Sequence, residues 1–145
     1  MMRISKNGLK LIKHFEGYFP KAYRCPAGLR TIGYGHLIKK GEKFPDRLTH
    51  NQAEQLLLND VKDAESAVHR MITVPLKQCQ YDALVSFTFN LGAGALQRST
   101  LRRKINRHEH EDVPKELMKW VRAGGRILGG LVKRRRAEVA LYSGA

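Results

Sequence analysis

The sequence HFEGYFPKAYRCPAGLRTIGYGH, residues 14–36, carries the strongest structural signals in the chain. Aromatic and β-branched residues are mixed in it with proline and glycine, which is typical of short strands joined by turns. We therefore predict strands within residues 17–35, joined by a tight turn at Cys25-Pro26-Ala27-Gly28. Upstream, Ser5 is a candidate N-cap, and apolar residues at helical spacing predict a helix over residues 5–15.

The sequence after residue 48 has mainly helical patterns. Thr49 and Gln52 form a capping-box arrangement at the start of one long amphipathic helix, residues 49–71. The most apolar helix is predicted over residues 77–91, and shorter helices over residues 99–107, 113–122 and 130–142. One helix, a small sheet and then several helices indicate an α+β protein with a helical majority.

The charge balance is the unusual bulk property of the chain. It has 145 residues and is 42% hydrophobic, which suits one domain with a real core. Its 27 Lys+Arg against 13 Asp+Glu give a net charge of +14. Such a charge favours binding to polyanions, and nucleic acid, anionic lipid and anionic cell-wall polymer all qualify.

The cysteines and the apolar runs indicate where the protein folds. Two cysteines, Cys25 and Cys79, are too few for a disulfide framework and fit a reducing cytosol. The sequence alone does not decide whether these two form a single disulfide. No apolar run has the length of a signal-peptide core or of a membrane span. We therefore expect a soluble protein without an export signal.

Three residues of the opening stretch are candidates for chemistry. Glu16 ends the first predicted helix, where the helix dipole and apolar neighbours disfavour ionisation and so favour a general acid. Cys25 lies at the turn between Arg24 and Arg30, and such cations lower the pKa of a thiol. Each residue also has a plain structural explanation: a surface glutamate, a small buried thiol, and for Thr31 a strand residue that packs.

Taken together, these residues resemble a known family. Glu16, eight residues, Cys25, five residues and Thr31, followed by IGYGH, resemble the active-site stretch of the phage-type lysozymes, in which the second position is Asp or Cys. The resemblance continues through SFTFNLGAGALQRSTLRRKIN at 86–106 and KWVRAGGRILGGLVKRRRAEVALY at 119–142. It implies a lysozyme-like fold in a single domain of residues 1–145. Its β-rich lobe would span about 17–48, and its helical lobe about 49–145 plus the N-terminal helix.

The resemblance also implies an activity. The chain would be an endolysin with muramidase activity, which cuts the β-1,4 bond between N-acetylmuramic acid and N-acetylglucosamine in peptidoglycan. Glu16 would be the acid, and Cys25 with Thr31 would hold and activate a water. Because a thiol replaces the second carboxylate of most glycosidases, several roles stay open for Cys25: base, nucleophile, stabiliser of the transition state, or group that orients water. We favour the water-directed role, hence inversion.

Other residues are expected to support this site or to do nothing chemical. We expect His36 to hydrogen-bond within the sheet and support the site. Asn90 resembles a position that faces the family's substrate cleft. Arg134 or Arg135 is expected to reach Glu16 from the last helix, which would favour the ionised carboxylate. RHEHED at 107–112 invites a metal, but histidines at i and i+2 do not share a helical face, so we expect no metal and no cofactor. Cys79 is predicted to lie in the core, and Trp120 to be a packing anchor rather than a platform for a sugar.

Two other classes of function compete with the enzyme. A nucleic-acid-binding protein would explain the basic charge, but no aromatic RNA-binding strand motif is present. A wall-binding module without activity would keep the fold. Residues 113–136 mix apolar residues with cations, so we also expect contact with anionic lipid or lipopolysaccharide. We expect a monomer, made in the cytoplasm of the host bacterium and admitted to the periplasm by a separate membrane-permeabilising protein.

Overall fold

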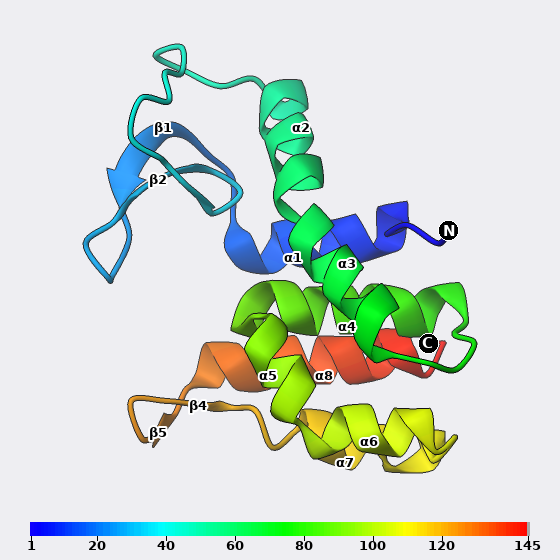
Figure 1. Cartoon of the computed structure of the whole chain (residues 1–145). Helices are drawn as coiled ribbons and strands as arrows, with labels where there is room; N and C mark the ends of the chain where they lie inside the picture. The colour runs from blue at the N-terminus through cyan, green and yellow to red at the C-terminus, as the bar shows by residue number, and fades with distance from the viewer. Residues whose placement is uncertain (145) are drawn as a thin grey trace. The chain divides into compact units, whose positions relative to one another are not determined.

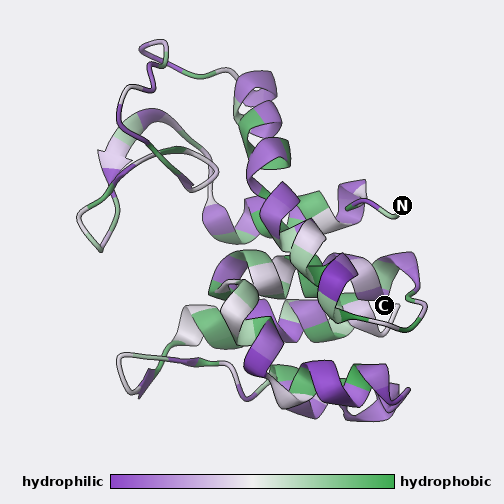
Figure 2. Cartoon of the chain, viewed as in Figure 1, coloured by the Kyte–Doolittle hydropathy of each residue, from purple (hydrophilic) through white to green (hydrophobic). Residues whose placement is uncertain are grey.

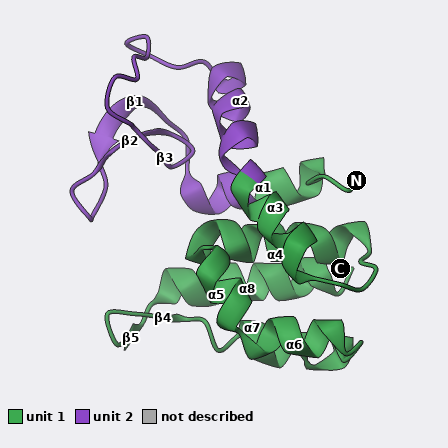
Figure 3. Cartoon of the chain, in the orientation of Figure 1, with its two compact units in different colours: residues 1–11, 63–145 green, residues 12–62 purple. Residues whose placement is uncertain are grey.

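The computed structural model describes residues 1–144, which form two compact units (Figures 1 and 3). One unit, here the sheet unit, comprises residues 12–62, and the other, the helical unit, comprises residues 1–11 together with the chain from residue 63 on. The elements, in chain order, are α1 (Lys6–Glu16), β1 (Phe19–Arg24), β2 (Arg30–Gly33), β3 (His36–Leu37), α2 (His50–Asp60), α3 (Lys62–Met71), α4 (Gln78–Leu91), α5 (Ala93–Arg98), α6 (Thr100–Asn106), the 3₁₀ helix η1 (His110–Asp112), α7 (Val113–Leu117), β4 (Arg122–Ala123), β5 (Arg126–Ile127) and α8 (Gly129–Tyr142).

The sheet unit contains an antiparallel sheet in the order β1-β2-β3. The predicted turn is confirmed, because the Gly28 N–H donates to the Cys25 carbonyl oxygen at 2.7 Å and the Cys25 N–H donates to the Leu29 carbonyl oxygen at 2.9 Å. The register pairs Tyr23 with Thr31. Residues paired in this way project to the same face of an antiparallel sheet.

Helix α2 packs on this sheet within the same compact unit. A β-carbon built on Gly33 of β2 would lie 3.5 Å from Leu48, 3.6 Å from Ala53 and 3.7 Å from Leu56. Figure 2 shows hydrophobic residues among hydrophilic ones along α2, and the buried residues Ala53 and Leu57 are four apart, so they share one side of the helix. The capping box is confirmed, since Thr49 and Gln52 bond to each other's backbone N–H.

The predicted long helix of residues 49–71 is wrong in one respect. It is two helices, α2 and α3, which are separated at Val61, although this residue keeps right-handed helical angles. The break directly follows Asp60, whose carboxylate is held by the His36 ring at 2.8 Å. Neither glycine nor proline marks the position, so helical periodicity alone does not reveal it.

The helical unit is built around α4, as the apolar pattern predicts. Ala83, Leu84, Val85 and Phe87 of this helix are fully buried, and α4 packs against α8 and α5. The predicted helix 113–122 ends earlier, at Leu117, and is followed by an unpredicted hairpin, β4–β5. Gly124 and Gly125 both have positive φ, +59° and +79°, which is the geometry of a two-residue hairpin turn.

The start of α1 is attached to α4 by a buried carboxylate. Asp82, which is 1% exposed, accepts hydrogen bonds from the Ser5 N–H at 3.0 Å, from the Ser5 hydroxyl and from the Gln78 amide. The Ser5 hydroxyl in turn lies 3.4 Å from the Gly8 N–H, as an N-cap does.

We expect Asp82→Ala to lower the free energy of unfolding by about 1–3 kcal/mol, because it leaves the part-buried Ser5 N–H and hydroxyl without their acceptor. Urea denaturation measures the difference. Asp63→Ala, on the exposed first turn of α3, is the control and is expected to cost less than about 0.5 kcal/mol. Equal stability of the two variants would contradict a structural role for the Asp82 carboxylate.

Candidate active site

Glu16 is the last residue of α1, and its carboxyl group lies against the IGYGH segment. The helix ends there because Gly17 takes a positive φ of +77°, while the Gly17 N–H still donates to the Lys13 carbonyl oxygen at 2.9 Å. A β-carbon built on Gly35 would lie only 2.6 Å from Glu16 Oε1. The carboxyl group therefore occupies the space next to the Gly35 backbone, whose positive φ of +77° also favours glycine.

Cys25 and Thr31 meet across the turn between β1 and β2. Hydrogen bonds lower the pKa of the Cys25 thiol: the largest effect comes from the Leu29 backbone, and the Ala27 backbone and the Thr31 hydroxyl add to it, against an opposing effect of burial. Thr31 is buried, and its hydroxyl donates to the Leu29 carbonyl oxygen at 3.0 Å. The Thr31 proton thus has two acceptors, this carbonyl and the thiolate.

Tyr23 links these groups and is not predicted from the sequence. It is the cross-strand partner of Thr31. Burial, followed by the negative charges of Cys25 and Glu16, raises the pKa of the Tyr23 hydroxyl. Tyr23 is therefore paired with one of the predicted catalytic residues and is affected by the charges of the other two. The only sequence signal is its place on a strand, two residues before Cys25.

His36 is buried between two carboxylates. Its Nδ1 lies 2.8 Å from Asp60 Oδ2 and its Nε2 lies 3.0 Å from Glu42 Oε1, so it attaches β3 both to the end of α2 and to the loop before it. Burial opposes protonation, but hydrogen bonds to Glu42 and Asp60 outweigh it and raise the pKa of His36. The Lys39 N–H and then His36 lower the pKa of Glu42, whereas burial raises the pKa of Asp60.

Comparison with known proteins identifies the family. The phage lysozyme family model matches residues 13–138. The chain belongs to the phage lysozyme family.

The relatives agree over nearly the whole chain. The endolysin of Acyrthosiphon pisum secondary endosymbiont phage 1 is 44% identical, over 99% of this chain and 100% of its own length. Among solved structures, the endolysin of Escherichia coli O157:H7 phage FAHEc1 has a TM-score of 0.89 and 39% identity, covering 97% of this chain and 93% of that one. A mutant of P22 lysozyme has a TM-score of 0.90 and 36% identity, covering 99% of each chain. The lysozyme-like fold is thereby confirmed.

The remaining predicted site residues of this phage lysozyme lie in the helical unit. Arg135 is fully buried, donates to the Asn90 side-chain oxygen and places its Nε 2.8 Å from Glu138 Oε1. Arg134 donates to the Ser86 carbonyl oxygen at 3.3 Å. Asn90 is thus engaged by an arginine of its own unit. That Arg134 or Arg135 reaches Glu16 stays a prediction.

Glu138 is a buried ion-pair partner of Arg134 and Arg135 that is not predicted from the sequence. The Ser86 hydroxyl donates to its Oε2 at 2.6 Å. Burial raises the pKa of Glu138 and lowers the pKa of Arg135. The sequence signal for this cluster is the i, i+3 and i, i+4 spacing of Arg135 and Arg134 with Glu138.

Trp120 contacts Phe87 edge-on at 5.5 Å between ring centroids, which agrees with its predicted packing role.

The Glu16–Gly35 contact of this family member predicts a loss of both stability and activity in Gly35→Ala. The added methyl group would collide with the carboxyl group and would strain a backbone with φ of +77°, costing about 1–2 kcal/mol and displacing the acid. Gly41→Ala is the matched control, because φ is +86° there and nothing lies within 4 Å. By denaturation we expect backbone strain to destabilise both variants, and Gly35→Ala more because of the collision. Release of reducing ends from purified wall should fall at least about tenfold only in Gly35→Ala. Equal activity would contradict the contact.

The His36 cluster predicts how stability depends on pH. Because the folded pKa is raised above the ordinary 6.5, the contribution of His36 is fully present below about pH 6.5 and is lost as the pH rises through the folded value. Urea denaturation at about pH 5.5 and about pH 8.5 should show wild type losing its advantage over His36→Gln at the higher pH. Gln97→Ala, a change at an exposed position whose side chain does not ionise, should show no such pH-dependent difference. A gap that grows with pH would contradict the paired imidazolium.

Proposed function

We propose that this phage lysozyme is an endolysin that hydrolyses the β-1,4 bond between N-acetylmuramic acid and N-acetylglucosamine in bacterial peptidoglycan. The observation that carries the proposal is that Glu16, placed against Gly35, lies in one compact unit with Cys25 and Thr31, which meet at the β1–β2 turn, in a member of this family. A carboxyl group, an acidified thiol and a hydroxyl within one small unit are the groups needed to donate a proton and direct a water. Membership in the family favours this enzyme over the nucleic-acid-binding and non-catalytic alternatives.

In the proposed mechanism the proton of the Glu16 carboxyl group moves to the bridging oxygen as the bond from this oxygen to the sugar C1 breaks. A water on the opposite face of the sugar attacks C1, and its proton passes to the Cys25 thiolate. The Thr31 hydroxyl, which has the thiolate and the Leu29 carbonyl as alternative acceptors, orients this water. The product sugar has the inverted configuration, and proton exchange with solvent restores Glu16 and Cys25.

The test is analysis of wall fragments after digestion in heavy-oxygen water. Wild type should place the heavy oxygen on C1 of N-acetylmuramic acid and release the inverted anomer first. A retained anomer would overturn the single displacement in favour of a sulfur nucleophile. Wall that binds the protein but yields no new reducing ends would overturn the enzyme and favour the wall-binding module.

A second candidate function concerns the segment 121–133, which contains β4 and β5. Ile127 and Leu128 are 58% and 42% exposed, and they stand among the cations Arg122, Arg126 and Lys133. No acidic residue occurs between Glu116 and Glu138. Exposed apolar side chains with cations match the chemistry of an anionic lipid or lipopolysaccharide surface. We infer that this segment contacts such surfaces and disturbs the outer membrane of Gram-negative cells.

Dye uptake by intact Gram-negative cells tests this second function without catalysis. A Glu16→Ala chain should admit the dye, and the same chain with Ile127→Ser and Leu128→Ser should admit much less. Leu37→Ser is the control, because Leu37 is 51% exposed but lies outside the segment. No uptake with Glu16→Ala, or equal uptake by all three chains, would overturn the surface role.

The described residues contain no helix that is long and apolar enough to cross a membrane. We propose that the monomer is made in the host cytoplasm and reaches the wall after another protein opens the inner membrane. The two free cysteines, Cys25 and Cys79, agree with a reducing compartment of synthesis. Expression in cells should cause lysis only after the inner membrane is permeabilised, and spontaneous lysis would contradict this order.

A further inference from the structure

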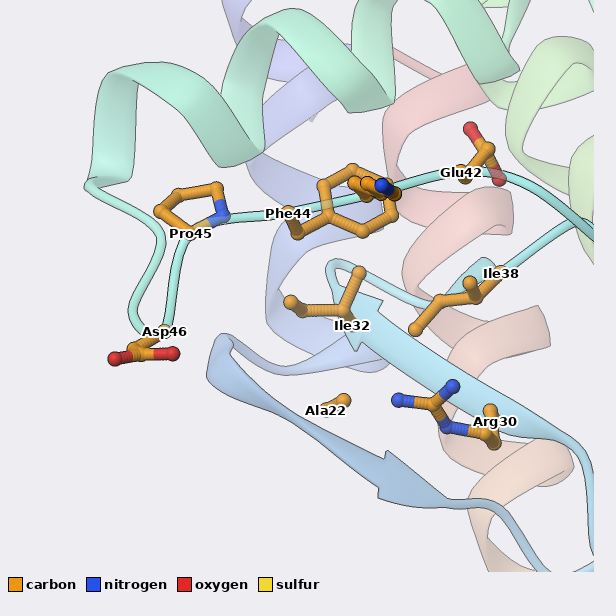
Figure 4. Close-up of a pocket in the computed structure, with 9 residues that line it drawn as sticks. Ala22, Arg30, Ile32, Ile38, Glu42, Phe44, Pro45 and Asp46 are labelled. Atoms are coloured by element: carbon orange, nitrogen blue, oxygen red, sulfur yellow. The ribbon is translucent and has the colours of Figure 1, made fainter.

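A groove of about 510 Å³ lies on the sheet unit between α2 and the loop that precedes it. Its apolar lining consists of Phe44, Pro45, Leu48 and Leu56. Phe44 and Pro45 also line a second pocket of about 420 Å³, which Figure 4 shows. In that view both residues lie on the loop next to α2. Glu16, Cys25 and Thr31 line neither space.

The polar lining of the groove consists of carboxamides alone. The sequence has five Asn and five Gln, and the four that fall within the sheet unit, residues 12–62, all line this groove: Asn51, Gln52, Gln55 and Asn59. Asn51, Gln55 and Asn59 are four residues apart, so they follow one another along one side of α2. This concentration is not required by the helix, because helix formers such as Glu or Lys serve exposed positions equally well.

Three of these carboxamides are available to a ligand. Gln52 is partly used, because its side-chain oxygen accepts the Thr49 N–H at 2.9 Å in the capping box. The other three are exposed, and within residues 1–144 their side chains take part in none of the hydrogen bonds or ion pairs of the fold. Each offers one acceptor oxygen and two N–H donors.

The groove has no charged lining residue, so it does not recognise a ligand through ion pairs. No Asp, Glu, Lys, Arg or His is among its lining residues, although 28% of the chain is charged. The complementary ligand is therefore uncharged, has an apolar face for Phe44 and Pro45, and carries both donors and acceptors along its edges. A pyranose has this form, since its C–H face is apolar and its edges carry hydroxyl groups, and an acetamido group adds an amide that pairs with a carboxamide.

We propose that the groove on α2 is a second saccharide site, which binds an uncharged N-acetylated sugar of a glycan strand through Asn51, Gln55 and Asn59 over Phe44 and Pro45. The choice of an N-acetylated sugar rests on the proposed function, whose substrate carries such sugars. Binding here retains the chain on intact wall and does not contribute groups to bond cleavage.

The experiment titrates isotope-labelled Glu16→Gln, which cannot cleave, with tri-N-acetylchitotriose and follows the backbone amide signals. We expect the amides of residues 51–59 and of Phe44 to shift together. Adding Gln55→Ala and Asn59→Ala should raise the dissociation constant of this set about tenfold or more, as loss of two hydrogen bonds implies. Gln97→Ala, an exposed carboxamide of the helical unit, should leave it unchanged.

Each opposite result overturns the second site. The second site is excluded if the amides of residues 51–59 do not shift, or if they shift equally in the double variant. It is also excluded if they shift equally with cellotriose, which lacks acetamido groups. Shifts produced only by an apolar dye would assign the groove to an apolar partner instead. Failure of the proposed function is seen separately, as wild type that releases no reducing ends from purified wall.

Discussion

Replacing Glu16 by glutamine should lower the rate of wall hydrolysis by about 10³-fold, within the range of 10²–10⁴ for loss of a general acid. Glutamine keeps the size of the side chain and its place next to Gly35, but it has no acidic proton to give to the bridging oxygen. Release of reducing ends from purified peptidoglycan measures the rate, and circular dichroism verifies that the variant is folded.

Glu54→Gln is the matched control for this experiment. Glu54 lies in the same unit and forms an ion pair with Lys13 at partly exposed positions, where such pairs contribute about 1 kcal/mol or less. We expect full activity from this variant. If Glu16→Gln retained more than about a tenth of wild-type activity, the general-acid assignment would be wrong.

Cys25→Ser is expected to reduce activity by about 10²-fold or more, because a serine hydroxyl does not ionise near neutral pH and cannot accept the proton of the attacking water. The change is nearly isosteric, and it keeps a side chain that can bond to the Thr31 hydroxyl. Full activity in this variant would exclude both the base and the nucleophile roles of the sulfur, leaving only orientation of water. The measurement is again release of reducing ends, with urea denaturation as a check on folding.

The pH profile separates the roles of Cys25 further. Hydrogen bonds, first that from the Leu29 backbone, lower the pKa of this thiol below its ordinary value of 9.0. If the thiolate is the base, activity rises with pH as the thiol ionises. In Cys25→Asp the rising limb should move several pH units lower, toward the carboxyl range near about 4, with activity restored. An unchanged rising limb in Cys25→Asp would show that another group sets it.

The parts of the fold that depend on neighbouring residues are predictable from the sequence. The turn after Cys25, the capping box at Thr49 and the buried helix α4 each have a short-range signal, and each is confirmed. The candidate residues Glu16, Cys25 and Thr31 are identified by their spacing and its resemblance to a family, because one glutamate, one cysteine and one threonine are unremarkable singly.

The parts that depend on distant partners are not predictable in this way. The break at Val61 follows a bond from Asp60 to a histidine 24 residues away. The closeness of Gly35 to Glu16 arises only when the end of α1 meets the sheet, and the pairing of Tyr23 with Thr31 depends on the strand register. The β4–β5 hairpin escapes prediction because Gly124-Gly125 is weak evidence for a turn without knowledge of its flanking strands.

The division of the chain places all of the proposed reactive groups on residues 12–62. A rigid-body displacement of one unit against the other would therefore leave the separations among Glu16, Cys25 and Thr31 unchanged. The requirement for a fixed reacting geometry therefore falls on one contiguous stretch of the chain, residues 12–62.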